Sequence, residues 1–337
     1  MDSTQPPLDD PLGVLTTTAA VVERSRHVRI AMERVATVAV EMARDPASPP
    51  GWDATLHFRD GTWRTAGWVL VLDALNFCFW SAESDPANRW RVECDGAVRD
   101  GYAALAAALS RAVVEGRPLW DAAYLAELDI AALREVLRPV PGAPEIPLLA
   151  ERWANLRELG SGLRDGIGGP RPVETLIARA GGSAVRLIAE VVRRFPSFDD
   201  TARYAGERVR FYKRAQIFVA DLAGAFEGAG PGAFADMAHL TAFADYKVPQ
   251  VLRELGVLVY DDHLAGLVDA RVLLPAGSPE EVEIRAGTIW AVEHLRRALS
   301  EACRPLRAFE IDWLLWTAGQ TLSVTARPYH RTVTGYY

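Results

Sequence analysis

Carboxylates and cations set among aromatic and apolar residues are the groups in this sequence that can do chemistry. Asp199 and Asp200 are adjacent acids that directly follow an aromatic turn. Asp245 and Lys247 flank Tyr246 in a largely apolar stretch that leads into a proline. Charges in such surroundings are costly to bury unless they are paired or functional. The pattern therefore predicts a pocket in which acids, a few cations and aromatic rings surround a small ligand.

Each of these patterns also has a purely structural interpretation. Adjacent acids are typical of the first turn of a helix, where they complement the positive end of the helix dipole, so Asp199 and Asp200 can open a helix that begins near Phe198. Asp245 and Lys247 can form a structural ion pair. Neither alternative is excluded by the sequence.

Basic residues occur in two further segments. Lys213 and Arg214 lie in an otherwise apolar predicted helix, either as an exposed face or as a pocket for an anion. The final segment, 328–337, is aromatic and basic where chain ends are usually polar and frayed. We therefore expect this end of the chain to be docked, with His330 and Arg331 available either for packing or for an anion.

A long apolar run, Gly67–Trp80, contains Asp73 and Asn76 as its only strong polar groups. Buried carboxylates and amides need hydrogen-bond partners, so this run predicts a buried element with satisfied polar groups. The charges in the segment Glu281–Arg285 are interpreted mainly as solvated.

Several classes of function are opposed by what the sequence lacks. Acidic residues outnumber basic ones by 44 to 37, which argues against a general nucleic-acid binder. There is no P-loop, GxGxxG, GxSxG or HExxH motif, and the six histidines and three cysteines are scattered, so we expect neither metal nor nucleotide-triphosphate chemistry. No signal peptide and no apolar stretch of about 18 residues is present, which predicts a cytoplasmic protein without a membrane span.

The spacing of apolar residues predicts a mainly α protein. We expect a loose tail over residues 1–12 and a single compact helical domain over 13–337 with one small β-hairpin at Ala54–Thr65. Helices are predicted over 14–43, in 101–137, over 147–159, 171–194, 208–227 and 249–254, after Asp261, and from a cap at Ser278. Gly160–Pro172, with five glycines and two prolines, is predicted to be a linker or mobile loop.

Seven blocks of this sequence resemble the queuosine salvage proteins, the queuosine 5′-phosphate N-glycosylase/hydrolases. The blocks follow the order of the family and are LDALNFCFW (72–80), FPSFDD (195–200), FYKRAQIFVADL (211–222), LTAFADYKVPQVLRELGVLVY (240–260), GSPEEVEIRAGTIWAVEHL (277–295), IDWLLW (311–316) and PYHRTVTGYY (328–337). Residues 1–50 and 85–145 contribute little to the resemblance.

The resemblance implies a fold similar to helical DNA glycosylases and hydrolysis of the N-glycosidic bond of queuosine 5′-monophosphate. The implied products are queuine and ribose 5-phosphate, with no metal or organic cofactor. Such a reaction builds oxocarbenium character on the ribose, which a carboxylate can stabilise while it activates water. The catalytic candidates are Asp199 and Asp245, and one of them can instead hydrogen-bond the N–H edge of the base.

The remaining candidates would bind the substrate. Those that can shape the base pocket or stack on the base are Asn76, Phe77, Trp80, Phe198 and Tyr246. Those that can bind the phosphate are Lys213, Lys247, His330 and Arg331, and Glu283 completes the substrate-binding set.

Two other functions stay open at the level of sequence. The same pocket can belong to a non-catalytic protein that binds a deazaguanine base or modified nucleotide and delivers it to a partner. A tRNA-binding role is a weaker third hypothesis, because the net charge of −7 opposes it.

Overall fold

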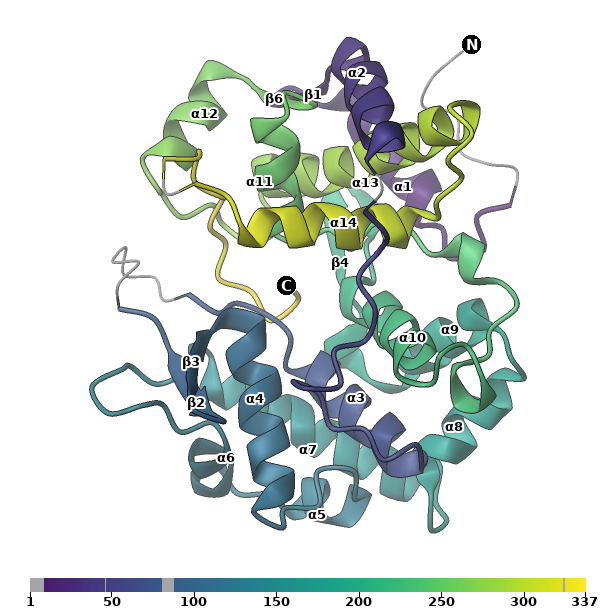
Figure 1. Ribbon diagram of the computed structural model, residues 1–337, viewed down its shortest axis with the longest axis vertical. Helices are drawn as coiled ribbons and strands as arrows, with labels where there is room; N and C mark the ends of the chain where they lie inside the picture. The colour runs from purple at the N-terminus through teal and green to yellow at the C-terminus, as the bar shows by residue number, and fades with distance from the viewer. Residues whose placement is uncertain (1–8, 46, 81–87, 324) are drawn as a thin grey trace. The chain divides into compact units, whose positions relative to one another are not determined.

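A computed structural model describes residues 9–45, 47–80, 88–323 and 325–337. Over these ranges it contains fourteen α-helices and three two-stranded antiparallel sheets, which confirms the mainly α class (Figure 1). Contacts divide the chain into two compact units. Unit 1 comprises the described residues up to Pro50, Asp200–Gln216 and Asp236–Val333, and unit 2 comprises Gly51–Asp199, Ile217–Ala235 and Thr334–Tyr337. Of the predicted tail, residues 1–8 lie outside the described ranges.

Unit 1 is built around one long buried helix. Its helices are α1 (Val14–Arg24), α2 (Met32–Arg44), α11 (Lys247–Glu254), α12 (Asp262–Asp269), α13 (Pro279–Glu301) and α14 (Ala308–Gln320). Its strands pair as β1 (Val28–Ile30) with β6 (Leu258–Tyr260), and β4 (Thr201–Tyr204) with β5 (Glu207–Arg210). Helix α10 (Lys213–Ala225) begins in unit 1 and continues in unit 2.

Helix α13 begins as its sequence predicts. The Ser278 hydroxyl accepts a hydrogen bond from the Glu281 amide and Pro279 occupies the first turn. Helices α1, α2, α11 and α14 all pack against α13 (Figure 1), and every residue from Glu281 to Leu295 is buried. The expectation that the charges of Glu281–Arg285 are solvated is therefore wrong, because Glu281, Glu283 and Arg285 are all buried.

Unit 2 packs seven helices and one hairpin. The helices are α3 (Trp63–Ala74), α4 (Gly101–Val114), α5 (Ala122–Glu127), α6 (Ile130–Val136), α7 (Leu149–Gly166), α8 (Pro172–Ala180) and α9 (Ala184–Arg194), and β2 (Arg91–Cys94) pairs with β3 (Ala97–Asp100). Ten consecutive residues of α3, Thr65–Ala74, are buried, which confirms the burial predicted for this apolar run.

The hairpin predicted at Ala54–Thr65 is wrong. The Thr62 hydroxyl instead accepts a hydrogen bond from the Arg64 amide and caps α3. Asp60 supports this cap, because its carboxylate accepts hydrogen bonds from the amide and hydroxyl of Thr62. A Thr preceded by an Asp–Gly turn thus starts a helix here, because its hydroxyl satisfies an amide of the first helical turn.

The glycine-rich segment Gly160–Pro172 is largely helical rather than a linker or mobile loop. Helix α7 continues to Gly166, and Pro172 is the first residue of α8. A Cβ atom at Gly160 would lie 2.1 Å from the Ala126 backbone nitrogen, and one at Gly162 would lie 2.7 Å from the Phe195 ring. These glycines therefore let α5 and the Phe195 ring approach α7 closely.

Two other predicted boundaries are wrong. The helix expected over 14–43 is interrupted by β1, which pairs with β6. The helix expected near Phe198 is a single 3₁₀ turn, Pro196–Phe198, and the chain then forms the β4–β5 hairpin before α10 begins at Lys213. Strand β1 pairs with β6, which is distant in sequence, and β4 pairs with β5 across a tight turn. Helical periodicity reveals neither kind of pairing. None of the described helices combines the length and apolarity needed to cross a membrane.

Candidate functional site

Asp200 holds the turn from which Lys213 projects in unit 1. Its carbonyl accepts hydrogen bonds from the amides of Phe211 (3.0 Å) and Tyr212 (3.2 Å), and its carboxylate accepts one from the Lys213 amide (3.2 Å). Tyr212 has a left-handed backbone with φ of 51°, which is uncommon outside glycine. Asp200 is therefore a capping residue, as its structural interpretation proposed, but the helix it serves is α10.

Arg285 of α13 binds the Asp200 carboxylate with both arms of its guanidinium group, at 2.9 and 2.6 Å. Its Nε donates to the Ala244 carbonyl at 3.1 Å, and Glu281 lies 3.6 Å from the guanidinium. All three charged side chains are at most 2% exposed. This buried ion cluster joins α13 to the segments that carry Lys213 and Asp245.

Asp245 lies just before α11 and is buried. Its Oδ1 accepts hydrogen bonds from the amides of Lys247 and Val248, each at 2.9 Å. Burial raises the pKa of the Asp245 carboxyl, while the positive charge of Lys213 and the two amide donors oppose that rise. The sequence predicts a buried acid near a cation. Asp245 is that acid, and the cation that acts on it is Lys213, which is also buried.

Asp312 of α14 was not among the sequence-predicted residues. Its Oδ1 accepts a hydrogen bond from the Phe243 amide at 2.9 Å, two residues before Asp245. Burial, followed by the negative charge of Asp245, raises the pKa of Asp312 well above its usual range. Burial raises the pKa of both acids, and the rise is larger at Asp312, where the charge of Asp245 adds to it. In the sequence, Asp312 could have been found as the one acid inside the apolar block IDWLLW (311–316).

Lys247 and Tyr246 lie beside Tyr329 near the end of the chain. The Lys247 ammonium donates to Gln250 Oε1 at 3.1 Å and lies 5.5 Å from the centre of the Tyr329 ring. The rings of Tyr246 and Tyr329 are 4.8 Å apart. A Cβ atom at Gly319 of α14 would meet the Lys247 stem at 2.6 Å, so this glycine leaves the path for the lysine side chain.

His330 and Arg331 are both buried in unit 1. Burial, with a smaller contribution from the charge of Arg285, lowers the pKa of His330 to about 3. His330 is therefore neutral at physiological pH and does not provide the cation expected from the sequence. The Arg331 guanidinium donates to the Arg271 carbonyl at 3.4 Å.

Glu283 of α13 is fully engaged with other parts of unit 1. Its Oε2 accepts hydrogen bonds from the Ser25 hydroxyl at 2.7 Å and from the consecutive amides of residues 26, 27 and 28. Its Oε1 accepts one from the Tyr204 hydroxyl at 2.7 Å. These contacts give Glu283 an architectural role at the end of α1.

In unit 2 the segment after α3 carries Asn76, Phe77 and Trp80, all of which are buried. The Arg152 guanidinium of α7 binds the carbonyls of Leu75, Phe77 and Cys78 and lies over the Phe77 ring at 4.2 Å. Cys78 has a left-handed backbone with φ of 39°, and its amide donates to the Tyr337 carbonyl at 2.9 Å. The predicted docking of the C-terminus is confirmed by this bond and by the burial of Tyr337.

Phe198 and Asp199 close the 3₁₀ turn of unit 2. Phe198 is fully buried with its ring 6.2 Å from that of Phe195, so it packs in the core of the unit. Asp199 is partly exposed, and its amide donates to the Pro196 carbonyl at 3.0 Å. The two adjacent acids thus belong to different units, with Asp200 on the other side of the boundary.

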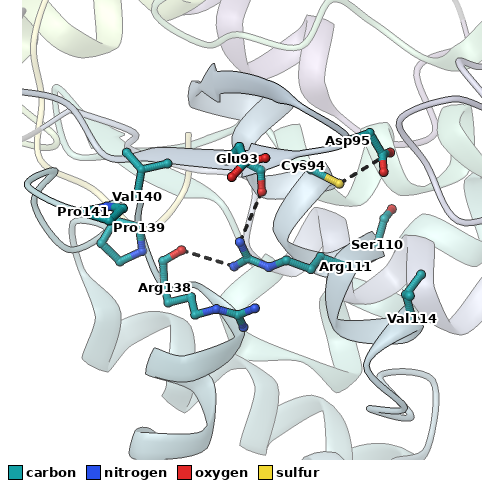
Figure 2. A pocket seen from close by; sticks show the side chains of 10 residues that line it. All are labelled: Glu93, Cys94, Asp95, Ser110, Arg111, Val114, Arg138, Pro139, Val140 and Pro141. Atoms are coloured by element: carbon teal, nitrogen blue, oxygen red, sulfur yellow. Dashed lines mark hydrogen bonds between the residues drawn. The ribbon is translucent and has the colours of Figure 1, made fainter.

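None of the predicted residues lines the hollow of unit 2 shown in Figure 2. It lies between the β2–β3 hairpin, α4 and the loop 138–141, and has a volume of about 500 Å³. The Arg111 guanidinium crosses it to the carbonyls of Glu93 and Arg138, and Arg138 pairs with Glu115. Both arginines hold the surrounding loops together, so this hollow has a structural explanation.

Comparison with known proteins identifies the family. A sequence model described as queuosine salvage protein matches residues 56–337, which contain every candidate residue named above. The chain belongs to the queuosine salvage protein family. It is 53% identical to the queuosine 5′-phosphate N-glycosylase/hydrolase of Sphaerobacter thermophilus over 97% of this chain and 98% of that protein.

Eukaryotic relatives with the same name are also similar. The Mus musculus protein is 37% identical over 80% of this chain and 81% of its own length. The Dictyostelium discoideum protein is 35% identical over 96% of this chain and 98% of its own length. The family resemblance read from seven sequence blocks is thus confirmed over most of the chain.

Proposed function

We propose that this chain hydrolyses the N-glycosidic bond of queuosine 5′-monophosphate and releases queuine and ribose 5-phosphate. The relatives described above carry the name of this activity. The observation that supports the chemistry is the buried group of Asp245, Asp312 and Lys213 in unit 1. Two acids whose surroundings separate their protonation states are typical of general acid–base catalysis.

In the proposed reaction water adds to C1′ of the ribose as the bond from C1′ to the base nitrogen breaks. The charged Asp245 carboxylate stabilises the oxocarbenium character at C1′ and accepts a proton from the attacking water. The electron pair of the broken bond goes to the base, and the protonated Asp312 donates the proton that neutralises it. The proton held by Asp245 then returns Asp312 to its acid form, and the water oxygen stays on C1′.

Lys213 supports Asp245 in this scheme, because the positive charge of Lys213 favours the ionised carboxylate against the cost of burial. We assign the phosphate to cations of unit 1, namely Lys247 and Arg331, with neutral His330 as a hydrogen-bonding partner. Tyr246 of unit 1 is proposed to contact the base. Asn76, Phe77 and Trp80 belong to unit 2, and their contact with the base stays a prediction from the sequence. Phe198 supports the turn that carries Asp199, and Glu283 is proposed to fix the end of α1.

The compartment and partners follow from the same proposal. A small-molecule nucleotide substrate requires no nucleic-acid surface, and the net charge of −7 does not favour one. The three cysteines are free thiols, which fits a reducing compartment, so we place the reaction in the cytoplasm.

The deciding experiment incubates the protein with queuosine 5′-monophosphate and measures free queuine by chromatography. Asp245→Asn keeps an oxygen for the Lys247 and Val248 amides, so it is expected to fold and to lose at least about 10³-fold in kcat. Asp199→Asn tests the second candidate in the same assay. If Asp245→Asn keeps full activity, the assignment of Asp245 is wrong, and a loss of activity in Asp199→Asn alone would move the role to Asp199. Tight base binding by the wild type without any product would instead support the non-catalytic binding protein.

The phosphate assignment has its own test in the same assay. Free queuosine lacks the phosphate, so its kcat/KM is expected to fall by about 10²-fold or more, because remote binding energy is lost. Lys247→Met should lower kcat/KM for the monophosphate and leave that for the nucleoside unchanged. Equal turnover of both substrates by the wild type would rule out anchoring of the phosphate.

A further inference from the structure

We propose that Arg285 is a positioning residue that fixes Lys213 and Asp245 with respect to each other. The inference deepens the proposed function and rests on it for the roles of those two residues. Arg285 lies on α13, whereas Lys213 begins α10 and Asp245 precedes α11. Arg285 thus contacts the segments that carry Lys213 and Asp245, which are 32 positions apart in the sequence.

The first support is the turn at the start of α10. Asp200 binds three consecutive amides there, those of residues 211, 212 and 213, through its carbonyl and its carboxylate. Tyr212 holds a left-handed backbone in the middle of this turn, a conformation that persists only when its surroundings impose it. Both oxygens of the Asp200 carboxylate are bound by Arg285. The orientation of this carboxylate, and with it the Lys213 backbone, therefore depends on Arg285.

The second support is the Ala244 carbonyl, which accepts a hydrogen bond from Arg285 Nε at 3.1 Å. Ala244 directly precedes Asp245 in the chain. The guanidinium plane also lies 3.8 Å from the centre of the Phe211 ring, and Phe211 belongs to the same turn as Lys213. Only a planar guanidinium can bind the Asp200 carboxylate and the Ala244 carbonyl and also lie over the Phe211 ring. A lysine ammonium cannot make all of these contacts.

The position of Lys213 matters because its charge acts on Asp245. The groups that act on the Asp245 carboxyl are Lys213 from α10, and Lys247 and the Val248 amide from α11. Asp312 from α14 is in turn acted on by the charge of Asp245. Burial raises the pKa of Asp245, and Lys213 is the largest influence that lowers it. If Lys213 moves away, the pKa of Asp245 rises further and the enzyme loses its charged carboxylate at a higher pH.

Arg253 offers a matched control in the same unit. It is buried on α11 and binds Asp269 with both arms, at 2.7 and 3.1 Å. It also lies over an aromatic ring, that of Tyr260, at 4.8 Å. Arg253→Lys therefore removes a similar buried fork with no described contact to Asp200 or Ala244.

The experiment compares Arg285→Lys and Arg253→Lys with the wild type in kcat, KM, the pH profile of kcat/KM and thermal unfolding. Both variants should lower the unfolding temperature. Arg285→Lys alone should lower kcat by about 10- to 100-fold, because small displacements of catalytic groups are costly. Its KM should change little, and the acidic limb of its profile should move to higher pH. Asp200→Asn, which keeps an acceptor for the Lys213 amide, should change kcat and pH profile in the same direction and serves if Arg285→Lys does not fold.

A second readout does not depend on activity. The titration of the Asp245 carboxyl can be followed by its ¹³C chemical shift, assigned with the Asp245→Asn variant. It should move to higher pH in Arg285→Lys and stay unchanged in Arg253→Lys. An unchanged titration and pH profile in Arg285→Lys would overturn the positioning role. A wild-type protein that releases no queuine would overturn the proposed function, while the carboxyl titration would still decide the role of Arg285.

Discussion

Two buried arginines organise the two units in different ways. Arg285 of unit 1 forms ion pairs with Asp200 and Glu281. The hydrogen bonds described for Arg152 of unit 2 go to backbone carbonyls, those of Leu75, Phe77, Cys78 and Pro147. Both guanidinium groups also lie over phenylalanine rings.

The two arginines differ in whether their partners can titrate. Around Arg285 the partners are carboxylates in a unit that also contains Asp245, Asp312 and Lys213, so a change of charge there alters the protonation of its neighbours. The described hydrogen-bond partners of Arg152 are carbonyls that do not titrate, and through them Arg152 supports the segment that carries Phe77 and Trp80. The surroundings of Arg285 in unit 1 are therefore expected to respond to pH, and those of Arg152 in unit 2 to stay the same across neutral pH.

The largest expected effect that tests this division concerns Asp312→Asn. The amide oxygen can still accept the Phe243 hydrogen bond, and burial already favours the neutral form of the native carboxyl, so the free energy of unfolding should change little. The variant lacks the acidic proton, and kcat should fall by about 10²- to 10³-fold. Single-turnover release of queuine, with thermal unfolding as the folding control, measures both quantities. Full activity would assign the proton transfer to another group.

An effect on stability is expected in unit 2. Arg152→Met removes hydrogen bonds to buried carbonyls and should lower the free energy of unfolding by about 3 kcal/mol. The loss should be constant between about pH 6 and 9, since backbone carbonyls do not titrate. Arg157→Met, at an exposed position of the same helix over the Trp153 ring, is the control. A strong pH dependence of the loss would contradict the comparison.

The smallest effect concerns His27 in unit 1. A hydrogen bond from its ring to Asp261 at 2.9 Å, together with the charges of Glu283 and Glu280, raises the pKa of His27 despite partial burial. This contribution to stability is complete below the unfolded pKa of about 6.5 and is lost as pH rises through the folded pKa. Because the ring is partly exposed, the effect should stay below about 1 kcal/mol.

The measurement is a double-mutant cycle of His27→Gln and Asp261→Asn, followed by thermal unfolding from pH 5.5 to 9. Asn at 261 keeps an oxygen for the Leu264 amide at the start of α12. The coupling energy should be present at the acidic end and vanish at the basic end. A coupling that is independent of pH would show that the pair contributes through geometry alone.

Much of the local structure was predictable from the sequence. The caps at Ser278 and Asp261 and the burial of the apolar run ending at Trp80 follow from residue types at fixed spacings. The hairpin at Ala54–Thr65 and the linker at Gly160–Pro172 were wrong, because turn residues and glycines serve several purposes. Only the neighbours of Gly160 show that it permits close packing instead of flexibility.

The sequence by itself determined the family, the helical class and a short set of acids, cations and rings, since these depend on composition and order along the chain. Tertiary structure decided what each charge does. Asp312 and Asp245 influence each other across 67 positions, His330 is made neutral by burial, and Glu283 binds the end of α1. The physical reason is that protonation and hydrogen bonding depend on distance and burial in space, whereas sequence periodicity reports only which side of one element is buried.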